Sequence, residues 1–277
     1  MNLTKTIGGG DMTAEINLAN GQMFRLEKGN LSVMWAGGAP EGRNPEIGWK
    51  NSEYLMFPII GAAHKDTIRL EGEDFPMAQH GLSRDLPWNV VLHDPDKLVM
   101  VQSYEAGEEV MNSKGFISVF PESFTITKAY AIEEDAHSGS ARFVLSIDIE
   151  AGSDLIYGIG WHPGWRNIDG GIIVLPSTNS AFAESNVREA EGNAMMLSGV
   201  KGVEYKNSEF ELEMVHDFGN TLLWDRGEGL VAIEPVSAMA VRRIPGSQGK
   251  DLGELEGYTR LVRGEIKTFT AIISIRT

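Results

Sequence analysis

The chain has 277 residues, of which 42% are hydrophobic and 23% are charged, with 32 glycines and no cysteine. This composition is typical of a soluble globular protein and excludes a collagen-like fibre, a disordered tail and a small disulfide-stapled secreted domain. A formal net charge of −15 repels phosphate backbones and anionic membrane surfaces, so we expect neither nucleic acid nor a membrane as a partner. The lack of cysteine, of a signal-peptide-like apolar segment and of an apolar run of about 18 residues favours a cytoplasmic protein.

The elements that the sequence predicts are mostly short strands. In residues 142–150, Phe143, Leu145, Ile147 and Ile149 alternate with polar residues, which is the pattern of a strand with one buried face. In chain order, strands are predicted over 31–35, 97–104, 116–120, 124–132, 142–150, 172–175, 210–215, 221–224, 230–233 and 268–276.

The fold class follows from how rarely a helical pattern occurs. Residues 184–197 are the only helical candidate, and Gly192 in their interior weakens it. A parallel βαβ architecture needs repeated helices of about ten residues or more between strands, and the sequence does not offer them. No linker and no repeat divides the chain. The sequence therefore predicts an all-β fold, a large antiparallel β-sandwich, in a single domain over residues 1–277, and it contains no signal for a particular oligomeric state.

Familiar cofactor motifs are absent from the sequence. The segment 246–250 lacks the Ser or Thr that follows the Lys of a P-loop, and Gly158-Ile-Gly160 lacks the third glycine and the crossover helix of a dinucleotide site. There is no HExxH, no Gly-x-Ser-x-Gly elbow and no calcium-binding loop. We therefore expect no metal and no cofactor.

Polar residues at the ends of two predicted strands are candidates for acid–base chemistry. Glu234 precedes Pro235 and follows the apolar run 230–233, and His162 precedes Pro163 at the end of another apolar run. Proline confines the residue before it to the extended region, which fixes the direction of an acid or base. The alternative is that each proline merely ends a strand and that His162 is a hydrogen-bonded core residue; this alternative is weaker for Glu234, because buried glutamates are rare unless paired.

Two further segments contain candidate binding residues. His80 and Arg84 lie within the loop-like segment 78–88, where binding residues tend to concentrate, although a structural loop with an Arg84–Asp85 surface pair explains it equally well. Asp225 follows the strand 221–224 as a weaker candidate, for which the start of a turn is the better explanation.

Taken together, three of these segments resemble the aldose 1-epimerase family, also called galactose mutarotases. QHGLSRDLPW is similar to that family's His-Gly-Phe-x-Arg motif, GIGWHPGW to its second His-Pro motif and LVAIEPVSA to its Glu-Pro-Trp strand. The flanks INLANGQMFRLEKGNLSVMWAGG, LMFPIIGA and YTRLVRGEIKTFTAIISI follow the family's order, so that the resemblance spans nearly the whole chain. It departs at Ala62, where the family commonly has an arginine, and at Val236, where an aromatic residue often follows Glu-Pro.

The resemblance implies a large antiparallel β-sandwich, the supersandwich, and interconversion of the α and β anomers of a sugar. By motif, Glu234 is expected to be the base that removes the proton from the C1 hydroxyl, and His162 the acid that protonates the ring oxygen. Such a pair needs neither metal nor cofactor. We expect its rate to fall when the pH drops far enough to protonate the carboxylate.

The resemblance also implies contacts with the sugar. His80 is expected to bind the ring oxygen or a neighbouring hydroxyl, with Arg84 as a second donor. Trp161 is expected to present an apolar face to the sugar, although core packing is its common alternative. Asp225 is expected, more weakly, to bind a hydroxyl.

Two other functions are compatible with the sequence. A hexose-6-phosphate 1-epimerase needs a cluster of basic residues for the phosphate; Ala62 and the net charge oppose it, whereas Arg84 and Arg242-Arg243 support it. A non-catalytic carbohydrate-binding protein of the same fold is favoured by the missing arginine and opposed by the presence of both Glu234 and His162.

Overall fold

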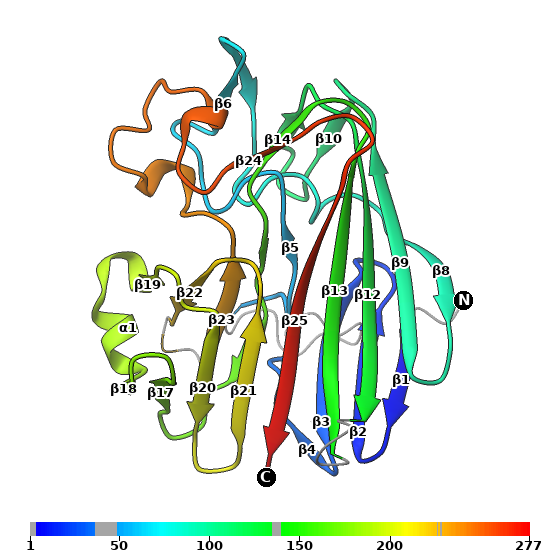
Figure 1. Cartoon of the computed structure of the whole chain (residues 1–277), viewed down its shortest axis with the longest axis vertical. Coiled ribbons are helices and arrows are strands. Elements are labelled where there is room, and N and C mark those ends of the chain that lie inside the picture. The colour runs from blue at the N-terminus through cyan, green and yellow to red at the C-terminus, as the bar shows by residue number, and fades with distance from the viewer. Residues whose placement is uncertain (1–3, 37–48, 135–139, 226, 228) are drawn as a thin grey trace.

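The computed structural model describes residues 4–36, 49–134, 140–225, 227 and 229–277. These residues form two layers of antiparallel strands that enclose one main hydrophobic core (Figure 1). The prediction of a large antiparallel β-sandwich is therefore confirmed.

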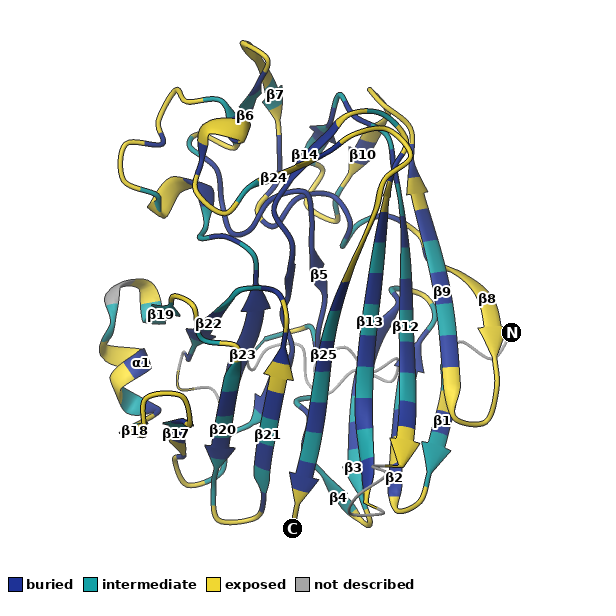
Figure 2. Ribbon diagram, in the orientation of Figure 1, coloured by how far each residue is buried: buried dark blue, intermediate teal, exposed yellow. Residues whose placement is uncertain are grey.

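Within the described ranges, the first layer is a nine-stranded sheet, of which Figure 1 shows the long central strands in front. Its order is β18 (Ser180–Ala183), β17 (Ile172–Leu175), β20 (Gly202–Lys206), β21 (Glu211–His216), β25 (Ile266–Arg276), β13 (Ala141–Ala151), β12 (Phe124–Glu134), β9 (Lys97–Tyr104) and β8 (Asn89–His93). The predicted alternation in β13 is confirmed: its apolar side chains are buried in the core, which appears as alternating bands in Figure 2.

Two sheets make up the second layer in the same part of the chain. The six-stranded sheet has the order β19 (Ala194–Leu197), β22 (Asn220–Trp224), β23 (Leu230–Val236), β15 (Gly160–Trp161) and β5 (Leu55–Met56), with β16 (Gly164–Arg166) also paired to β23. The four-stranded sheet contains β1 (Thr4–Gly9), β2 (Met12–Asn17), β3 (Gln22–Lys28) and β4 (Leu31–Ser32), and its first two strands pack against β12 and β13.

Short elements connect these sheets. In the ranges that the structure describes, three two-stranded ribbons pair β6 (Thr67–Leu70) with β7 (Glu73–Pro76), β10 (Glu109–Met111) with β11 (Ile117–Val119), and β14 (Leu155–Tyr157) with β24 (Thr259–Leu261). The helical segments in the described residues are α1 (Ser185–Glu189) and the 3₁₀ turns η1 (Glu191–Asn193), η2 (Val241–Arg243) and η3 (Leu252–Glu254). None of them has the length and hydropathy that a membrane-spanning helix requires.

The prediction of a helix over 184–197 is wrong for most of its length. Helix α1 ends at Glu189, and Gly192 adopts a left-handed φ of 63°, which breaks the helical path. The four residues that follow form β19, because their backbone pairs with β22.

The predicted strand over 31–35 is likewise too long. It ends as β4 at Ser32, after which the chain crosses from one sheet of the second layer to the other. The Val33 N–H still donates to Leu26 in β3, at 2.9 Å, whereas the Trp35 N–H donates to Gly164 in β16, at 2.9 Å. A segment that changes sheets cannot remain one regular strand.

Candidate active site

Strand β23 presents Glu234 on the face of the six-stranded sheet that lies away from the main core. Val231 and Ile233 belong to that core, and side chains alternate between the two faces of a strand, so Glu234 points to the opposite face. The whole strand is buried, as its uniform dark colour in Figure 2 shows. Glu234 itself is only 1% exposed.

Strand pairing brings His162 across from Glu234. The β15 segment pairs with β23 through Gly160, and β16 pairs with it through Gly164. These two glycines lie two residues before and two residues after His162, on either side of Glu234. The His162 Nε2 atom lies 3.4 Å from Glu234 Oε1, and His162 is 5% exposed.

Both flanking glycines are needed for close packing around His162. A Cβ atom at Gly160 would lie 2.5 Å from Cε of Met56 and 2.9 Å from Cγ1 of Val236. A Cβ atom at Gly164 would lie 2.9 Å from Cζ3 of Trp49. The absence of side chains at these positions allows neighbouring side chains to close around the imidazole.

Aromatic rings surround His162 on several sides. The Trp49 ring stacks on the imidazole with centroids 4.7 Å apart and planes 28° apart. The Tyr54 ring lies 4.8 Å from it, and the Trp224 ring meets it edge-on at 5.7 Å. The sequence analysis did not identify these three residues as part of a site, because they come from separate segments that meet only in the folded sheet.

His80 lies beside this group, with its ring centroid 5.8 Å from that of His162. It has a left-handed φ of 69°, and its Nδ1 accepts a hydrogen bond from the Gly61 N–H at 3.2 Å. Burial lowers the pKa of His80, and its Nε2 lies 3.0 Å from the side-chain amide nitrogen of Gln79. The loop thus places a second buried imidazole next to His162.

Arg84 extends from the same loop over the Tyr54 ring, with its guanidinium carbon 4.7 Å from the ring centroid. Stacking of this kind stabilises a cation over an aromatic face. Within the described ranges, no carboxylate forms an ion pair with Arg84. Its positive charge lowers the pKa of both His80 and His162 in addition to the effect of burial.

Burial gives Glu234 and His162 opposite pKa shifts. Loss of solvation raises the pKa of Glu234 well above its usual range. Burial lowers the pKa of His162 to about 3, and the positive charge of Arg84 adds to this effect. Because the pKa of Glu234 lies above that of His162, a pair that holds one proton consists of a protonated carboxyl beside a neutral imidazole.

Two buried polar atoms of this pair lack a hydrogen-bond partner in the described part of the chain. They are Oε2 of Glu234 and Nδ1 of His162. Buried polar atoms are almost always satisfied in folded proteins, so atoms that are not satisfied require an explanation. The hydroxyl groups of a bound ligand would supply the missing partners.

No protein-family model matches the chain, and no curated protein matches it significantly in sequence. Solved structures do match over nearly its whole length. A galactose mutarotase related enzyme from Lactobacillus acidophilus superposes with a TM-score of 0.78 at 18% identity, covering 99% of this chain and 97% of its own. A galactose mutarotase-like protein from Lactobacillus casei ATCC 334 gives 0.78 at 16% identity, covering 99% and 100%. The galactose 1-epimerase from Lactobacillus acidophilus NCFM gives 0.66 at 9% identity, covering 97% and 92%.

The chain has the galactose mutarotase-like fold. This confirms the fold that the sequence resemblance implied. The three segments that resemble the aldose 1-epimerase motifs contain His80 and Arg84, His162, and Glu234, respectively. These four residues lie close together in the folded chain although they are far apart in sequence.

Trp161, in contrast, does not join this group. It is fully buried, and its indole N–H donates to the Glu53 carboxylate inside the molecule. Alternation along β15 places Trp161 and His162 on opposite faces of the sheet. The expected contact between Trp161 and a sugar is therefore replaced by a structural role, while Trp49, Tyr54 and Trp224 supply the aromatic surface near His162.

Asp225 is also occupied by structural contacts. Its Oδ2 accepts hydrogen bonds from Arg188 Nη2 at 2.9 Å and Nε at 3.2 Å. Its Oδ1 accepts one from the Gly227 N–H at 2.6 Å. The carboxylate is fully buried directly after Trp224. Both of its oxygens are thus engaged by protein groups.

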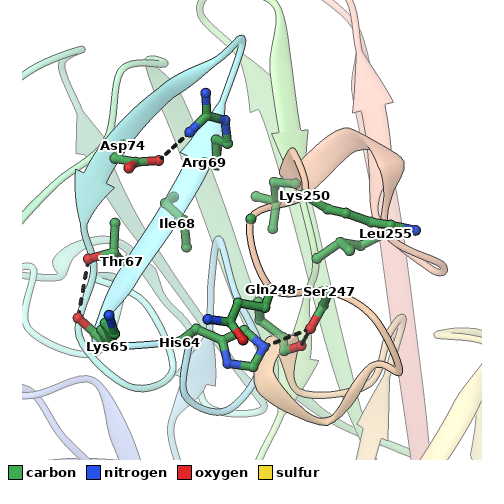
Figure 3. Close-up of a pocket in the computed structure, with 13 residues that line it drawn as sticks. His64, Lys65, Thr67, Ile68, Arg69, Asp74, Ser247, Gln248, Lys250 and Leu255 are labelled. Atoms are coloured by element: carbon green, nitrogen blue, oxygen red, sulfur yellow. Dashed lines mark hydrogen bonds and ion pairs between the residues drawn. The ribbon is translucent and has the colours of Figure 1, made fainter.

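A separate cavity of about 260 Å³ lies between the β6–β7 ribbon and the segment 247–255 (Figure 3). His64 Nε2 lies 2.9 Å from Ser247 Oγ there, which resembles a catalytic dyad. The Ser247 hydroxyl, however, donates to the Val241 carbonyl at 2.7 Å, and Ser247 is 3% exposed. An occupied, buried hydroxyl is not a nucleophile, and the cavity contains neither Glu234 nor His162.

Proposed function

We propose that the protein is an aldose 1-epimerase, an isomerase that interconverts the α and β anomers of a hexose. The observation that supports this proposal most strongly is the Glu234–His162 pair, with 3.4 Å between carboxylate oxygen and imidazole nitrogen. In a cyclic sugar, the C1 hydroxyl and the ring oxygen are bonded to the same carbon. An acid and a base that act on these two oxygens must therefore be neighbours, as these side chains are.

In the proposed reaction, the Glu234 carboxylate takes the proton from the C1 hydroxyl while His162 donates a proton to the ring oxygen. The bond between C1 and the ring oxygen breaks and leaves an open-chain aldehyde. Rotation about C1–C2 presents the other face of the carbonyl, and ring closure returns both protons. Each proton that leaves the sugar is matched by one that enters it, so no cofactor takes part.

The unliganded pair reaches its reactive form by an internal proton shift. Its single proton resides on Glu234 because burial disfavours both charges. A sugar hydroxyl that donates to the unpaired Oε2 would stabilise the carboxylate and move the proton to the imidazole. After ring opening, Glu234 is again protonated and His162 neutral, which is the state that burial favours.

We assign the remaining residues to binding. His80 would bind the ring oxygen or a neighbouring hydroxyl, and Arg84 would donate to another sugar oxygen. The Trp49 and Trp224 rings would exclude water and offer apolar surface to the C–H groups of the sugar.

Polarimetry on freshly dissolved α-anomers of a panel of free and phosphorylated hexoses tests this function. The wild-type protein should accelerate mutarotation of at least one sugar, and Glu234→Gln should not. Sugar binding without acceleration would instead favour a non-catalytic carbohydrate-binding protein.

A hexose-6-phosphate 1-epimerase is the second candidate, supported by the cation of Arg84, which has no carboxylate partner among the described residues. Acceleration confined to phosphorylated hexoses would establish it, whereas acceleration of the free hexoses alone would exclude it.

A further inference from the structure

A fully buried carboxylate, Glu53, receives hydrogen bonds from several parts of the sandwich. Its Oε1 accepts from the Met23 N–H at 3.1 Å, from Lys128 Nζ at 3.3 Å and from the Tyr130 hydroxyl. Its Oε2 accepts from the indole N–H of Trp161. Glu53 is 0% exposed, and the Lys128 side chain is 2% exposed.

The Lys128 ammonium is held by further contacts. It donates to the Gly21 carbonyl at 2.6 Å and lies 4.5 Å from the centre of the Trp88 ring. A buried ion pair is weak evidence for stability, since well-packed apolar residues of similar size often do as well. We therefore looked for a role of the Glu53–Lys128 ion pair in the residues that contact it.

The Glu53 cluster is linked to the proposed active site through two pairs of consecutive residues. Glu53 is followed by Tyr54, and Trp161 is followed by His162. Their backbones are paired, with the Tyr54 N–H donating to the His162 carbonyl at 3.3 Å and the His162 N–H donating to the Tyr54 carbonyl at 3.0 Å. The Glu53–Trp161 side-chain bond thus lies on the inner face of the same backbone ladder that carries Tyr54 and His162 on the other face.

We propose that Glu53 is a positioning residue that, through the indole N–H of Trp161, holds the imidazole of His162 beside Glu234. The contacts with Lys128 and the Met23 N–H fix the direction of the Glu53 carboxylate, so that the Trp161 ring cannot turn. With this ring fixed, the 161–162 peptide keeps its place against Tyr54, and the His162 ring remains in contact with its aromatic neighbours. The catalytic part of this inference rests on the proposed epimerase function.

The substitution Trp161→Phe tests the connection, because it removes the indole N–H and leaves both members of the ion pair in place. Trp165→Phe is a matched control: Trp165 is also fully buried, its ring lies 6.1 Å from that of Trp161, and its indole nitrogen has no hydrogen-bond partner among the described residues. Trp161→Phe should lower kcat for mutarotation about 10- to 100-fold with KM nearly unchanged, as small displacements of a catalytic group do. Trp165→Phe should leave kcat within about threefold of wild type.

NMR of the His162 ring provides a readout that does not depend on activity. The His162 signals are assigned by their loss in His162→Gln, and the chemical shifts and titration midpoint of the imidazole are then compared. Trp161→Phe and Glu53→Gln should shift the His162 signals and move its titration midpoint towards its ordinary value, whereas Trp165→Phe should not. If wild type accelerates no sugar, the proposed function fails, but the NMR comparison still decides this inference. His162 signals that are unchanged in Trp161→Phe, or changed equally in both tryptophan variants, would overturn it.

Discussion

His162 Nε2 lies 3.4 Å from Glu234 Oε1, and the two side chains are 6% and 1% exposed. An imidazole and a carboxyl that are buried together lose solvation together, so the pKa of one falls while that of the other rises. The pair is therefore more stable with one proton than with none or with two. This state has both an acid and a base, which is what a reversible proton exchange at one sugar carbon requires.

Removing either member of the pair should abolish most of the catalysis. A positioned acid or base contributes about 10²–10⁴-fold, so Glu234→Gln and His162→Asn should each lower kcat by about that factor. The double variant should lose much less than the product of the two losses, because the groups act as a unit. Polarimetry with a saturating sugar measures the effect, with circular dichroism as a control for folding. A Glu234→Gln protein that folds and retains near-native mutarotation would show that the base is another residue.

The pH dependence of kcat/KM, which reports the unliganded enzyme, should show no inflection near pH 4.5, where an ordinary glutamate titrates. The one-proton pair persists from the pKa of His162, about 3, up to the raised pKa of Glu234. Activity should thus be constant across pH 4.5 and decline only when the pH rises through the raised pKa of Glu234 and the pair loses its proton. The sequence alone predicts a loss of rate at low pH instead. A fall in kcat/KM as the pH drops through 4.5 would contradict the burial argument.

Burial of the Glu234 carboxyl group should make the free energy of unfolding depend on pH. Its pKa is higher in the folded than in the unfolded state, so the folded state binds more protons above about pH 4.5, and its stability declines as the pH rises through the folded pKa. Glu234→Gln removes this titration. The variant should gain unfolding free energy over wild type at pH 8, and gain less at pH 4.5. Urea denaturation at both pH values measures the difference, and an equal effect at the two would refute it.

The absence of a side chain at Gly164 should be essential for stacking of the Trp49 ring on the His162 imidazole. A Cβ atom there would lie 2.9 Å from Cζ3 of Trp49 and 3.3 Å from Cβ of Trp35. Gly164→Ala should displace Trp49, lower the mutarotation rate about tenfold and cost about 1–3 kcal/mol in stability. Gly202→Ala is the matched control, since a Cβ atom at Gly202 meets nothing within 4 Å. Equal activities of the two variants would show that Trp49 does not matter to the reaction.

Arg84 should contribute to binding more than to folding. It stacks on Tyr54, is partly exposed and has no carboxylate partner in the described segments, so Arg84→Ala leaves no buried charge unpaired. We expect sugar affinity to fall about tenfold, as loss of a hydrogen bond from a charged donor does, with an unfolding midpoint close to that of wild type. Isothermal titration with the best sugar of the panel measures the affinity. Unchanged affinity for every sugar would remove Arg84 from the site.

The sequence determined the fold class and most of the long strands, because alternation of apolar and polar residues is a local property. Strands β9 and β17 have the predicted bounds, and β12, β13 and β25 contain or extend the predictions. The sequence did not indicate the N-terminal hairpins or β19. The strand state of β19 depends on its partner β22, and that of β1, β2 and β3 on their pairing with one another.

For the candidate site, the sequence provided His80, Arg84, His162 and Glu234, because proline, glycine and the resembling motifs mark them locally. Only the tertiary structure decided that Trp161 points into the core and that Arg188 and the Gly227 N–H occupy the Asp225 carboxylate. It also decided which aromatic rings contact His162 and that burial leaves the acid–base pair with one proton. These properties depend on strand register and on the exclusion of water by residues distant in sequence, and neither is encoded in the local pattern around a single residue.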